Sequence, residues 1–564
     1  MRMFTRKSAT ALRYCVAVAT FLATVVAGAQ AQTGPNVTVF ESGPVRPLAL
    51  SPDGTQLFAC NTPDNRLEVF DVLPGGITHV ASVPVGLEPV AVAARTNSEV
   101  WVVNHLSDSV SIVDVSVTPP RVVRTLLVGD EPRDIVFAGS TGNRAFITTA
   151  RRGQHRTDPS ISAVPGAGDP KLTVPGTPRA DVWVFDATSL GNTLGGTPLK
   201  ILELFGDTPR ALAVSPDGNT VYAAIHFSGN QTTVVSEGIV RDGFTGVGQG
   251  GGDGISVANG LPNGAVPGGL PAPATNHEGV AAPEVGLIVK YDKASGQWRD
   301  AGNRNWTNGV RFNLPDRDVF AINANTLTES RSWTSVGTML FNMTVHPTTG
   351  KVYVSNTEAN NLTRFEGPGV WGGSTVQGKL ALSRISVLDP GNGADVTAVR
   401  HLNKHINYST LPAPAGTKQH SLATPLEMVI DPVTNKLYVA AFGSAKIGVF
   451  DVTALDNDTF NPTAISSDYI PVSGGGPAGL ALDDTNSRLY VLTRFNNSVA
   501  VVDLTTGQET GQVPLHNPEP THVVEGRPFL YDAFHTSSNG EASCASCHVF
   551  GDLDHLAWDL GNPD

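Results

Sequence analysis

Two cysteines and a histidine near the carboxyl end of the chain bring together groups that can bond covalently to a cofactor and bind a metal. Cys544 and Cys547 are separated by two residues, and His548 follows directly. Two thiols at this spacing can each bond one vinyl group of a haem, and the adjacent imidazole can bind the iron as its proximal ligand. We therefore predict one covalently attached haem c, with Cys544, Cys547 and His548 as the cofactor-binding residues and His548 as the metal ligand.

Three other uses of these residues stay open at the level of sequence. A disulfide between Cys544 and Cys547 would need no histidine, and a thioredoxin-like redox pair belongs in a βαβ context that this segment lacks. A zinc site would need further ligands, of which His555 is the nearest candidate. The distal haem ligand is open too, because no methionine follows His548 and His555 lies only seven residues further on.

The first residues of the chain have the pattern of a secretory signal peptide. Four basic residues lie within the first 13 positions, a short apolar run covers residues 16–27, and Ala29-Gln30-Ala31 fits a small-x-small cleavage site. We predict a signal peptide over residues 1–31 and a periplasmic or secreted mature protein, which agrees with haem c attachment outside the cytoplasm. Retention as a membrane anchor would need about 18 or more apolar residues, and no later stretch is long enough to span a bilayer.

The charge of the chain restricts its partners. The formal net charge of −13 becomes −17 when the four basic residues of the signal peptide are removed. An acidic surface repels phosphate backbones, and no basic stripe is present, so we expect no nucleic acid partner. A basic redox partner protein, such as a small cytochrome or another electron carrier, is compatible with this charge.

The middle of the chain repeats one pattern seven times. Each copy has a short apolar strand, a tight turn, a second apolar strand and an alternating third strand that ends near an aspartate, as in residues 45–71. Four antiparallel strands at a period of about 40–50 residues are typical of propeller blades. We predict an all-β fold in which residues 32–515 form a seven-bladed β-propeller, with either residues 36–41 or residues 508–515 completing the last blade. The copies contain Val45, Glu88, Pro132, Pro209, Val352, Pro425 and Pro477.

Long insertions are expected on one face of this propeller. In a four-stranded meander, the loop after the second strand and the connection to the next blade emerge on the same face. All the long insertions are predicted at such positions, and long loops on a rigid scaffold often carry binding. The insertions lie near residues 151–180, 228–286, 293–335, 357–383 and 390–423.

Other polar or reactive side chains in the propeller region are weaker candidates. If residues 401–405 are helical, His401 and His405 share a face, and His420 lies in the same insertion, so a metal site is an alternative to surface histidines. His105 and His226 follow the second strands of their blades and are a second candidate metal pair. The remaining thiol of this region, Cys60, is predicted to be buried. 

Two family resemblances extend these predictions. Val352-Tyr353-Val354-Ser355-Asn356 and its equivalents resemble the YVTN family of β-propeller repeats. Gly526-Arg527-Pro528-Phe529-Leu530-Tyr531-Asp532 and the Ser537–Gly540 turn before the cysteines resemble the start of the first haem domain of bacterial di-haem cytochrome c peroxidases. The second resemblance implies thioether bonds at Cys544 and Cys547, a proximal ligand at His548, and a mainly α cytochrome c segment over residues 516–564. Because only 16 residues follow His548, we expect this cytochrome domain to be truncated at Asp564.

The sequence thus predicts an exported c-type haem protein that carries out one-electron transfer, with the propeller as scaffold or docking platform. One alternative is an enzyme, a peroxidase-like di-haem oxidoreductase, whose second haem would need sequence that this chain lacks. The other alternative is a propeller that binds a partner. The redox potential, the electron donor or acceptor, any substrate and the oligomeric state are open.

Overall fold

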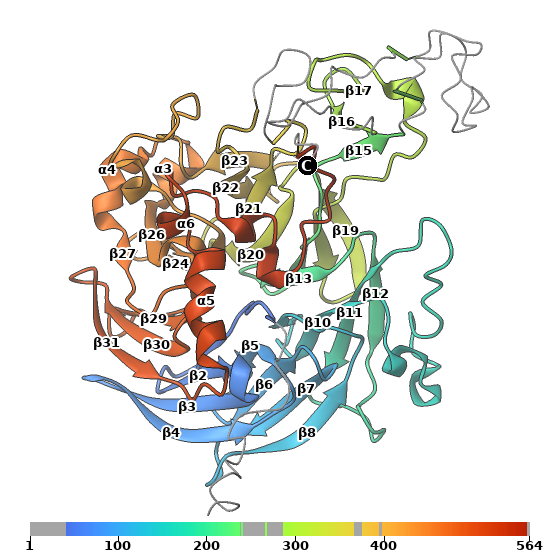
Figure 1. The fold of residues 1–564 in the computed structure, drawn as a ribbon. Coiled ribbons are helices and arrows are strands. Elements are labelled where there is room, and N and C mark those ends of the chain that lie inside the picture. Colours follow the sequence, from blue (N-terminus) through green and yellow to red (C-terminus); the bar gives the residue numbers. More distant parts are fainter. Residues whose placement is uncertain are drawn as a thin grey trace, which may run out of the picture.

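The computed structural model describes residues 41–236, 239–240, 266–267, 286–365, 375–393 and 397–560. Within these residues strands dominate and helices are short (Figure 1). The predicted signal peptide and most of the candidate closing strand, residues 36–40, lie outside them. No helix in the described ranges is long and apolar enough to cross a membrane.

Seven sheets of four antiparallel strands make up most of the described chain, and in each sheet the strands pair in chain order. An eighth, three-stranded sheet is inserted between the second and third strands of the fourth. The four-stranded sheets are β1 (Leu48–Leu50), β2 (Gln56–Asn61), β3 (Arg66–Leu73) and β4 (Gly76–Pro84); β5 (Pro89–Ala94), β6 (Glu99–Asn104), β7 (Ser109–Asp114) and β8 (Arg121–Leu127); β9 (Ile135–Ala138), β10 (Arg144–Ala150), β11 (Ala180–Asp186) and β12 (Lys200–Leu204); β13 (Pro209–Val214), β14 (Thr220–Ile225), β18 (Val319–Asn323) and β19 (Thr328–Trp333); β20 (Met339–Val345), β21 (Val352–Ala359), β22 (Ala381–Leu388) and β23 (Thr397–His401); β24 (Pro425–Asp431), β25 (Lys436–Ala441), β26 (Lys446–Asp451) and β27 (Ile470–Pro471); and β28 (Pro477–Asp483), β29 (Arg488–Thr493), β30 (Ser498–Asp503) and β31 (Gln508–Pro514). The inserted sheet contains β15 (Thr232–Val235), β16 (Leu287–Asp292) and β17 (Gln297–Arg299).

The helices are short connections between these strands or follow the last of them. They are η1 (Thr62–Asp64), η2 (Gln154–Thr157), η3 (Pro159–Ile161), η4 (Thr307–Gly309), η6 (Thr417–His420), η7 (Phe442–Ser444), α3 (Val452–Asp456), α4 (Pro462–Ile465), η8 (Ser466–Asp468), α5 (Thr521–Tyr531), α6 (Ala533–Thr536), η9 (Cys544–Ser546) and η10 (Val549–Gly551).

The tight turns of the repeat follow from its Ser-Pro-Asp-Gly sequence. In the first copy, the Ser51 hydroxyl donates to Asp53 Oδ1 at 2.7 Å, and the same oxygen accepts from the Thr55 backbone amide at 3.1 Å. Gly54 has a φ of +71°, which a residue without a Cβ adopts at no steric cost. The turn therefore reverses the chain between two apolar strands within a few residues.

The four-stranded sheets are arranged in a closed ring. The first strands of the sheets contact one another in chain order, from β1 to β5, β9, β13, β20, β24 and β28, and β28 contacts β1. Apolar side chains fill the spaces between neighbouring sheets, as where Phe58 and Val69 pack with Val92 and Val102. Each fully buried side chain of this kind contributes about 1.5 to 3 kcal/mol to folding. This ring of antiparallel meanders is the architecture of a β-propeller.

The last sheet is completed by the carboxyl-terminal candidate. Strand β31 pairs with β30 over its length, so residues 508–515 contain the fourth strand of this sheet. The seam between the last sheet and the first is closed by packing, in which Tyr490 and Val499 contact Leu48 and Phe70.

Arg46 links several sheets at the centre of the ring. Its guanidinium donates to both carboxylate oxygens of Asp134, at 3.3 and 3.2 Å, to Glu427 at 3.3 Å and to the carbonyl oxygen of Leu212 at 2.8 Å. Asp134 and Glu427 are both buried, and burial raises the pKa of Glu427 to about 8 although Arg46 opposes this shift. One side chain near the start of the ring thus contacts the third, fourth and sixth sheets.

We expect Arg46→Ala to lower the free energy of unfolding by about 3 to 5 kcal/mol, because it leaves the buried Asp134 carboxylate without its cation and removes a donor from the buried Glu427 side chain. Denaturant unfolding measures this loss. Arg66→Ala is the matched control: Arg66 pairs with Asp64 at 3.1 Å and is partly exposed, so its loss should be below about 1 kcal/mol. Equal losses in the two variants would contradict a central role for Arg46.

The insertions follow the predicted pattern, with two corrections. Residues 151–179 join β10 to β11, and residues 360–380 join β21 to β22, so both follow a second strand. The predicted insertion over residues 390–423 is divided, because β23 occupies Thr397–His401 and leaves residues 402–424 as the connection to the next sheet. The predicted insertion over residues 293–335 includes β18 and β19, the third and fourth strands of the fourth sheet. Its long polar loops concealed these two strands in the sequence.

Residues 516–560, here called the C-terminal strap, run back over the ring (red in Figure 1). The strap contains α5, α6, η9 and η10, and its aromatic side chains pack on residues that follow second strands, such as Phe442 and Phe495. The strap therefore lies on the face that carries the insertions. The helices of the strap contact one another, α5 with η9 and η9 with η10, and they also pack against the ring.

Candidate functional site

The Cys-x-x-Cys-His motif forms a tight turn on the surface of the strap. The backbone amides of Cys547 and His548 donate to the carbonyl oxygen of Cys544 at 3.3 and 3.0 Å. Ala545 and Ser546 are buried beneath the turn, whereas Cys544 and His548 are exposed and Cys547 is half-buried. The turn thus exposes the Cys544 and His548 side chains and keeps Cys547 partly covered.

The two thiols are not bonded to each other, and Cys547 lies in surroundings unlike those of a redox-active thiol. Both Cys544 and Cys547 are free in this structure. Burial, with smaller contributions from Asp554 and Cys544, raises the pKa of Cys547 to about 12. A redox-active pair of the thioredoxin type needs a thiol whose pKa is lowered, so this environment does not suit that alternative.

A cavity of about 470 Å³ opens beside Cys544. This volume is within the range of cofactor and ligand pockets, and the surface of the cavity is mostly apolar. Three parts of the chain enclose it: the insertion between β21 and β22, the connection after β23, and the strap. Its lining residues are Phe365, Thr375, Val376, Gln377, Gly378, Leu380, Leu411, Thr536, Ser537, Ser538, Asn539, Ala542, Ser543 and Cys544.

Glu541, three residues before Cys544, fixes the strap to the ring. Its side chain is fully buried, and Oε1 accepts from the Ser383 backbone amide at 3.2 Å and from Asn403 Nδ2 at 2.9 Å. His401 Nε2 lies 2.8 Å from the same oxygen, and the Tyr408 hydroxyl donates to Oε2. Burial and the charge of Glu541 raise the pKa of Tyr408 above its ordinary value. The carboxylate therefore satisfies donors from the fifth sheet and from the connection that follows it.

A second polar cluster holds α5. Arg527 is buried and donates to both carboxylate oxygens of Glu41, at 2.8 and 3.1 Å, and to Glu519 at 2.5 Å. Arg494, just after β29, donates to Glu519 at 2.8 and 3.2 Å. Although burial opposes the shift, these hydrogen bonds lower the pKa of Glu519 to about 2. The cluster joins the strap to the last sheet and to Glu41 near the start of the described chain.

This lowered pKa predicts how acid acts on the strap. Because the pKa of Glu519 is lower in the folded protein than its ordinary value of 4.5, its ion pairs stabilise the fold above that value and are lost as the pH falls towards 2. We expect a contribution of about 2 kcal/mol, reduced by solvent screening of a partly buried group. Thermal unfolding of the wild type and Glu519→Gln should therefore differ most near neutral pH and converge in acid. A difference independent of pH would contradict this assignment.

Phe550, two residues after His548, inserts its ring among the aromatic side chains of the ring face. It packs against Phe341 and Phe442, with centroids 6.4 and 5.9 Å away, and the guanidinium of Arg210 lies 4.8 Å from its centroid. A Cβ on Gly43 would come within 2.5 Å of the Phe550 ring, so only glycine permits this contact. The haem motif is thereby held close to the inner strands of the ring.

The histidines His105 and His226 are buried in the ring but do not form a metal site. His105 Nδ1 lies 3.3 Å from the Pro132 carbonyl oxygen, and His226 Nδ1 lies 2.8 Å from that of Leu340. Burial lowers the pKa of both, to about 3 for His105, and the cationic side chains of Arg133 and Arg210 lower it further. Two neighbouring guanidinium groups would also repel a metal cation.

Two of the insertion histidines lie side by side: the rings of His405 and His420 are 5.7 Å apart, edge to face. Residues 402–405 form a turn rather than a helix, so His401 and His405 share no helix face. His401 contacts Glu541, whereas His405 Nε2 lies 3.0 Å from the Thr417 carbonyl oxygen and His420 Nδ1 lies 2.6 Å from Ser466 Oγ. Nowhere in the described ranges do three or more His, Cys, Asp or Glu side chains form a group that could hold a metal ion.

The two remaining candidate residues are His555, considered as a metal ligand, and Cys60, predicted to be buried. His555 packs on Phe227, with ring centroids 4.2 Å apart, and its Nε2 lies 3.8 Å from Asp552. Cys60 is fully buried, as predicted, and burial raises the pKa of its thiol.

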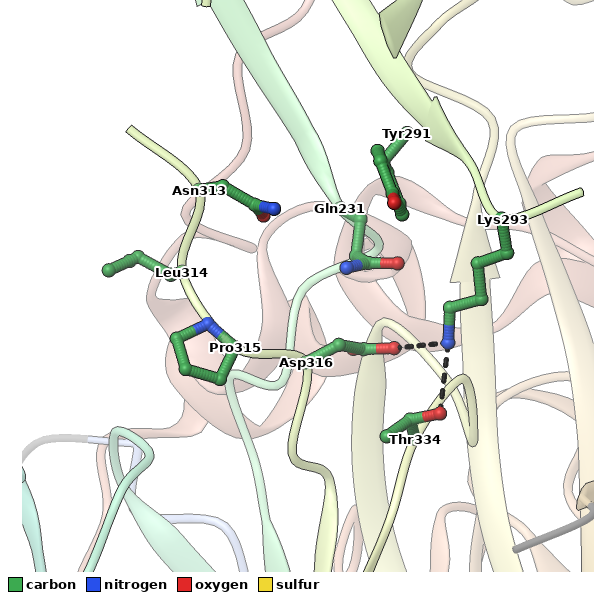
Figure 2. Close-up of a pocket in the computed structure, with 8 residues that line it drawn as sticks. All are labelled: Gln231, Tyr291, Lys293, Asn313, Leu314, Pro315, Asp316 and Thr334. Carbon is green, nitrogen blue, oxygen red and sulfur yellow. Dashed lines mark hydrogen bonds and ion pairs between the residues drawn. The ribbon is translucent and has the colours of Figure 1, made fainter. Parts of the chain in front are cut away.

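A second hollow, of about 560 Å³, lies beside the inserted sheet (Figure 2). Three of the residues that line this hollow are joined by hydrogen bonds: Lys293 Nζ donates to Asp316 at 2.8 Å and to Thr334 at 2.9 Å. No part of the Cys-x-x-Cys-His motif lines it, and no sequence pattern singled it out. Its lining residues are Gln231, Tyr291, Lys293, Asn313, Leu314, Pro315, Asp316 and Thr334.

Solved structures with a similar course of the chain are distant in sequence. Hydrazine synthase from Kuenenia stuttgartiensis is 16% identical with a TM-score of 0.49, and the match covers 83% of this chain and 98% of that one. Apo AztD from Citrobacter koseri is 11% identical with a TM-score of 0.35, covering 84% and 86%. A putative 6-phosphogluconolactonase from Bacteroides uniformis is 14% identical with a TM-score of 0.36, covering 83% and 87%. These likenesses carry no argument about function.

No model of a protein family matches the sequence, and no curated protein matches it either. The resemblances to YVTN repeats and to di-haem cytochrome c peroxidases therefore stay predictions from the residues that carry them.

Proposed function

We propose that this chain is an exported c-type haem protein that carries out one-electron transfer. The observation that carries the proposal is the turn of Cys544, Cys547 and His548, whose first cysteine lines a mostly apolar cavity. Cys544 and Cys547 would tether haem c and His548 would bind its iron, and the bound group would supply a one-electron couple between ferric and ferrous iron. The chain contributes attachment, orientation and exclusion of water.

The ring would act as the scaffold that fixes this site. Seven four-stranded sheets in a closed ring support a seven-bladed propeller, and Glu541, Arg527 and Phe550 hold the motif on one of its faces. The acidic charge of the mature chain, together with the predicted signal peptide, supports a basic redox partner in the periplasm or outside the cell.

A peroxidase-like enzyme is the second candidate, and the resemblance of residues 526–548 to the di-haem peroxidases favours it. This chain holds one Cys-x-x-Cys-His motif, so a second haem would have to come from additional sequence. One-electron transfer needs only the one haem site that this chain contains, and we therefore propose it rather than peroxidase activity.

Expression of the chain with the cytochrome c maturation machinery tests the proposal. We expect a Soret band, a haem-stained band after denaturing electrophoresis, and one haem per chain by pyridine haemochrome assay. Absence of both the Soret band and the stain would overturn the proposal in favour of a partner-binding propeller. Peroxide turnover by the same preparation would favour the peroxidase.

A further inference from the structure

We propose that the insertions of the propeller build one apolar wall of the haem site. This inference rests on the proposed function and adds residues that no haem motif contains. The wall consists of Phe365, Val376 and Leu380, from the insertion between β21 and β22, and Leu411, from the connection after β23.

The first argument is the position of these side chains. They line the same cavity as Cys544, whose thiol is a predicted attachment point. Phe365 and Leu411 are 40% and 56% exposed, so this side of the cavity is accessible to a group held at Cys544. A flat apolar cofactor tethered at Cys544 would cover them.

The second argument is that the wall is bonded to the strap that carries the motif. The Phe365 backbone amide donates to the carbonyl oxygen of Asp559 at 2.8 Å. Asn539 Nδ2 donates to the carbonyl oxygen of Gly378 at 3.2 Å. The two sides of the cavity are therefore held at a fixed separation by hydrogen bonds at both ends.

The wall has a chemical consequence. Apolar side chains exclude water from the cavity, and burial in a low dielectric is one of the means by which a protein sets a haem potential. Exclusion of water disfavours the more highly charged ferric state. Residues of the propeller would thus set the potential at which the chain exchanges electrons.

Leu411→Asp and Phe365→Ser test this inference in the haem-loaded chain. Both side chains are exposed enough for a polar substitution to be tolerated, and the attachment motif is untouched. We expect the same haem stain as in the wild type and a midpoint potential shifted to lower values, because a carboxylate or water beside the cofactor favours ferric iron. Leu314→Asp, at a 69% exposed leucine of the second hollow, is the matched control and should leave the potential unchanged.

The outcomes separate the two proposals. An unchanged potential in both Leu411→Asp and Phe365→Ser, with haem attached, would overturn the wall and leave the proposed function standing. An equal shift in Leu314→Asp would overturn it too, since the effect would then be one of general surface charge. A wild-type chain without haem would overturn the proposed function and the wall together.

Discussion

A variant in which Cys544 and Cys547 are both alanine is expected to carry no covalent haem. Thioether bonds form only at thiols, and within the described chain the remaining cysteine, Cys60, is fully buried in the first sheet. Loss of both thiols should therefore abolish the haem stain after denaturing electrophoresis. The fold should persist, because the exposed Cys544 contributes little buried area and neither thiol is bonded to the other.

Single substitutions separate the contributions of the two cysteines and the histidine to haem binding. Cys544→Ala and Cys547→Ala should each keep one thioether bond and show a weaker stain. His548→Ala should keep both bonds and instead change the absorption spectrum, because the proximal ligand is lost. Cys60→Ala is the control for removal of a thiol, and it should retain a full stain at a cost of about 1 kcal/mol or less in stability. A persistent stain in the double variant would contradict attachment at this motif.

Glu541→Ala is expected to release the strap from the ring. The substitution leaves the donors of His401, Asn403 and Tyr408 buried without their carboxylate, and removal of one partner from a buried charged cluster costs about 3 to 5 kcal/mol. Because the ring has its own core, we expect local opening of the strap rather than global unfolding. Hydrogen exchange at residues 520–560 should rise, while exchange in the sheets stays at the wild-type level.

Glu525→Ala is the matched control for this result. Glu525 lies on α5 in the same strap, is exposed, and is unaffected by the contacts of Glu541. Its substitution should leave exchange unchanged. If Glu541→Ala behaves like Glu525→Ala, the buried carboxylate is not what holds the strap. If it unfolds the sheets as well, the strap and the ring are one cooperative unit.

Much of the fold could be predicted because strands and turns depend on residues that are neighbours in the sequence. Alternation of apolar residues and turns such as Ser51-Pro52-Asp53-Gly54 specify strands and reversals within a few positions, and the predicted strands of the ring are confirmed. The strand at Gln508–Pro514 was an open alternative because its polar sequence has a weak pattern, and pairing with β30 decides it. Strand β19 was assigned to an insertion for the same reason, whereas the apolar strand β18 was missed because a long insertion separates it from β14.

The candidate site also has a part that could be predicted from neighbouring residues and a part that could not. The Cys-x-x-Cys-His turn could be recognised from five consecutive residues. Glu541, Arg527 and Phe550 could not, because their partners His401, Glu41 and Phe442 lie 140, 486 and 108 positions away in other elements. No local signal distinguishes a side chain that will be buried by such contacts from one that will be exposed. The prediction that His401 and His405 share a face was wrong for a related reason. A spacing of four residues places two side chains on one face only in a helix, and residues 402–405 form a turn.

The order of folding also follows from one ionic cluster, which contains Arg527, Glu41, Glu519 and Arg494. Each four-stranded sheet consists of one continuous stretch of chain, so a sheet can form as soon as that stretch is free to fold. The contact between Arg527 and Glu41, in contrast, joins positions 486 residues apart and can form only after residue 527 has been synthesised. Cys544 and Cys547 therefore reach their place on the ring after the sheets that precede them in the chain. An export and maturation system that handles an extended chain would meet them before they are docked.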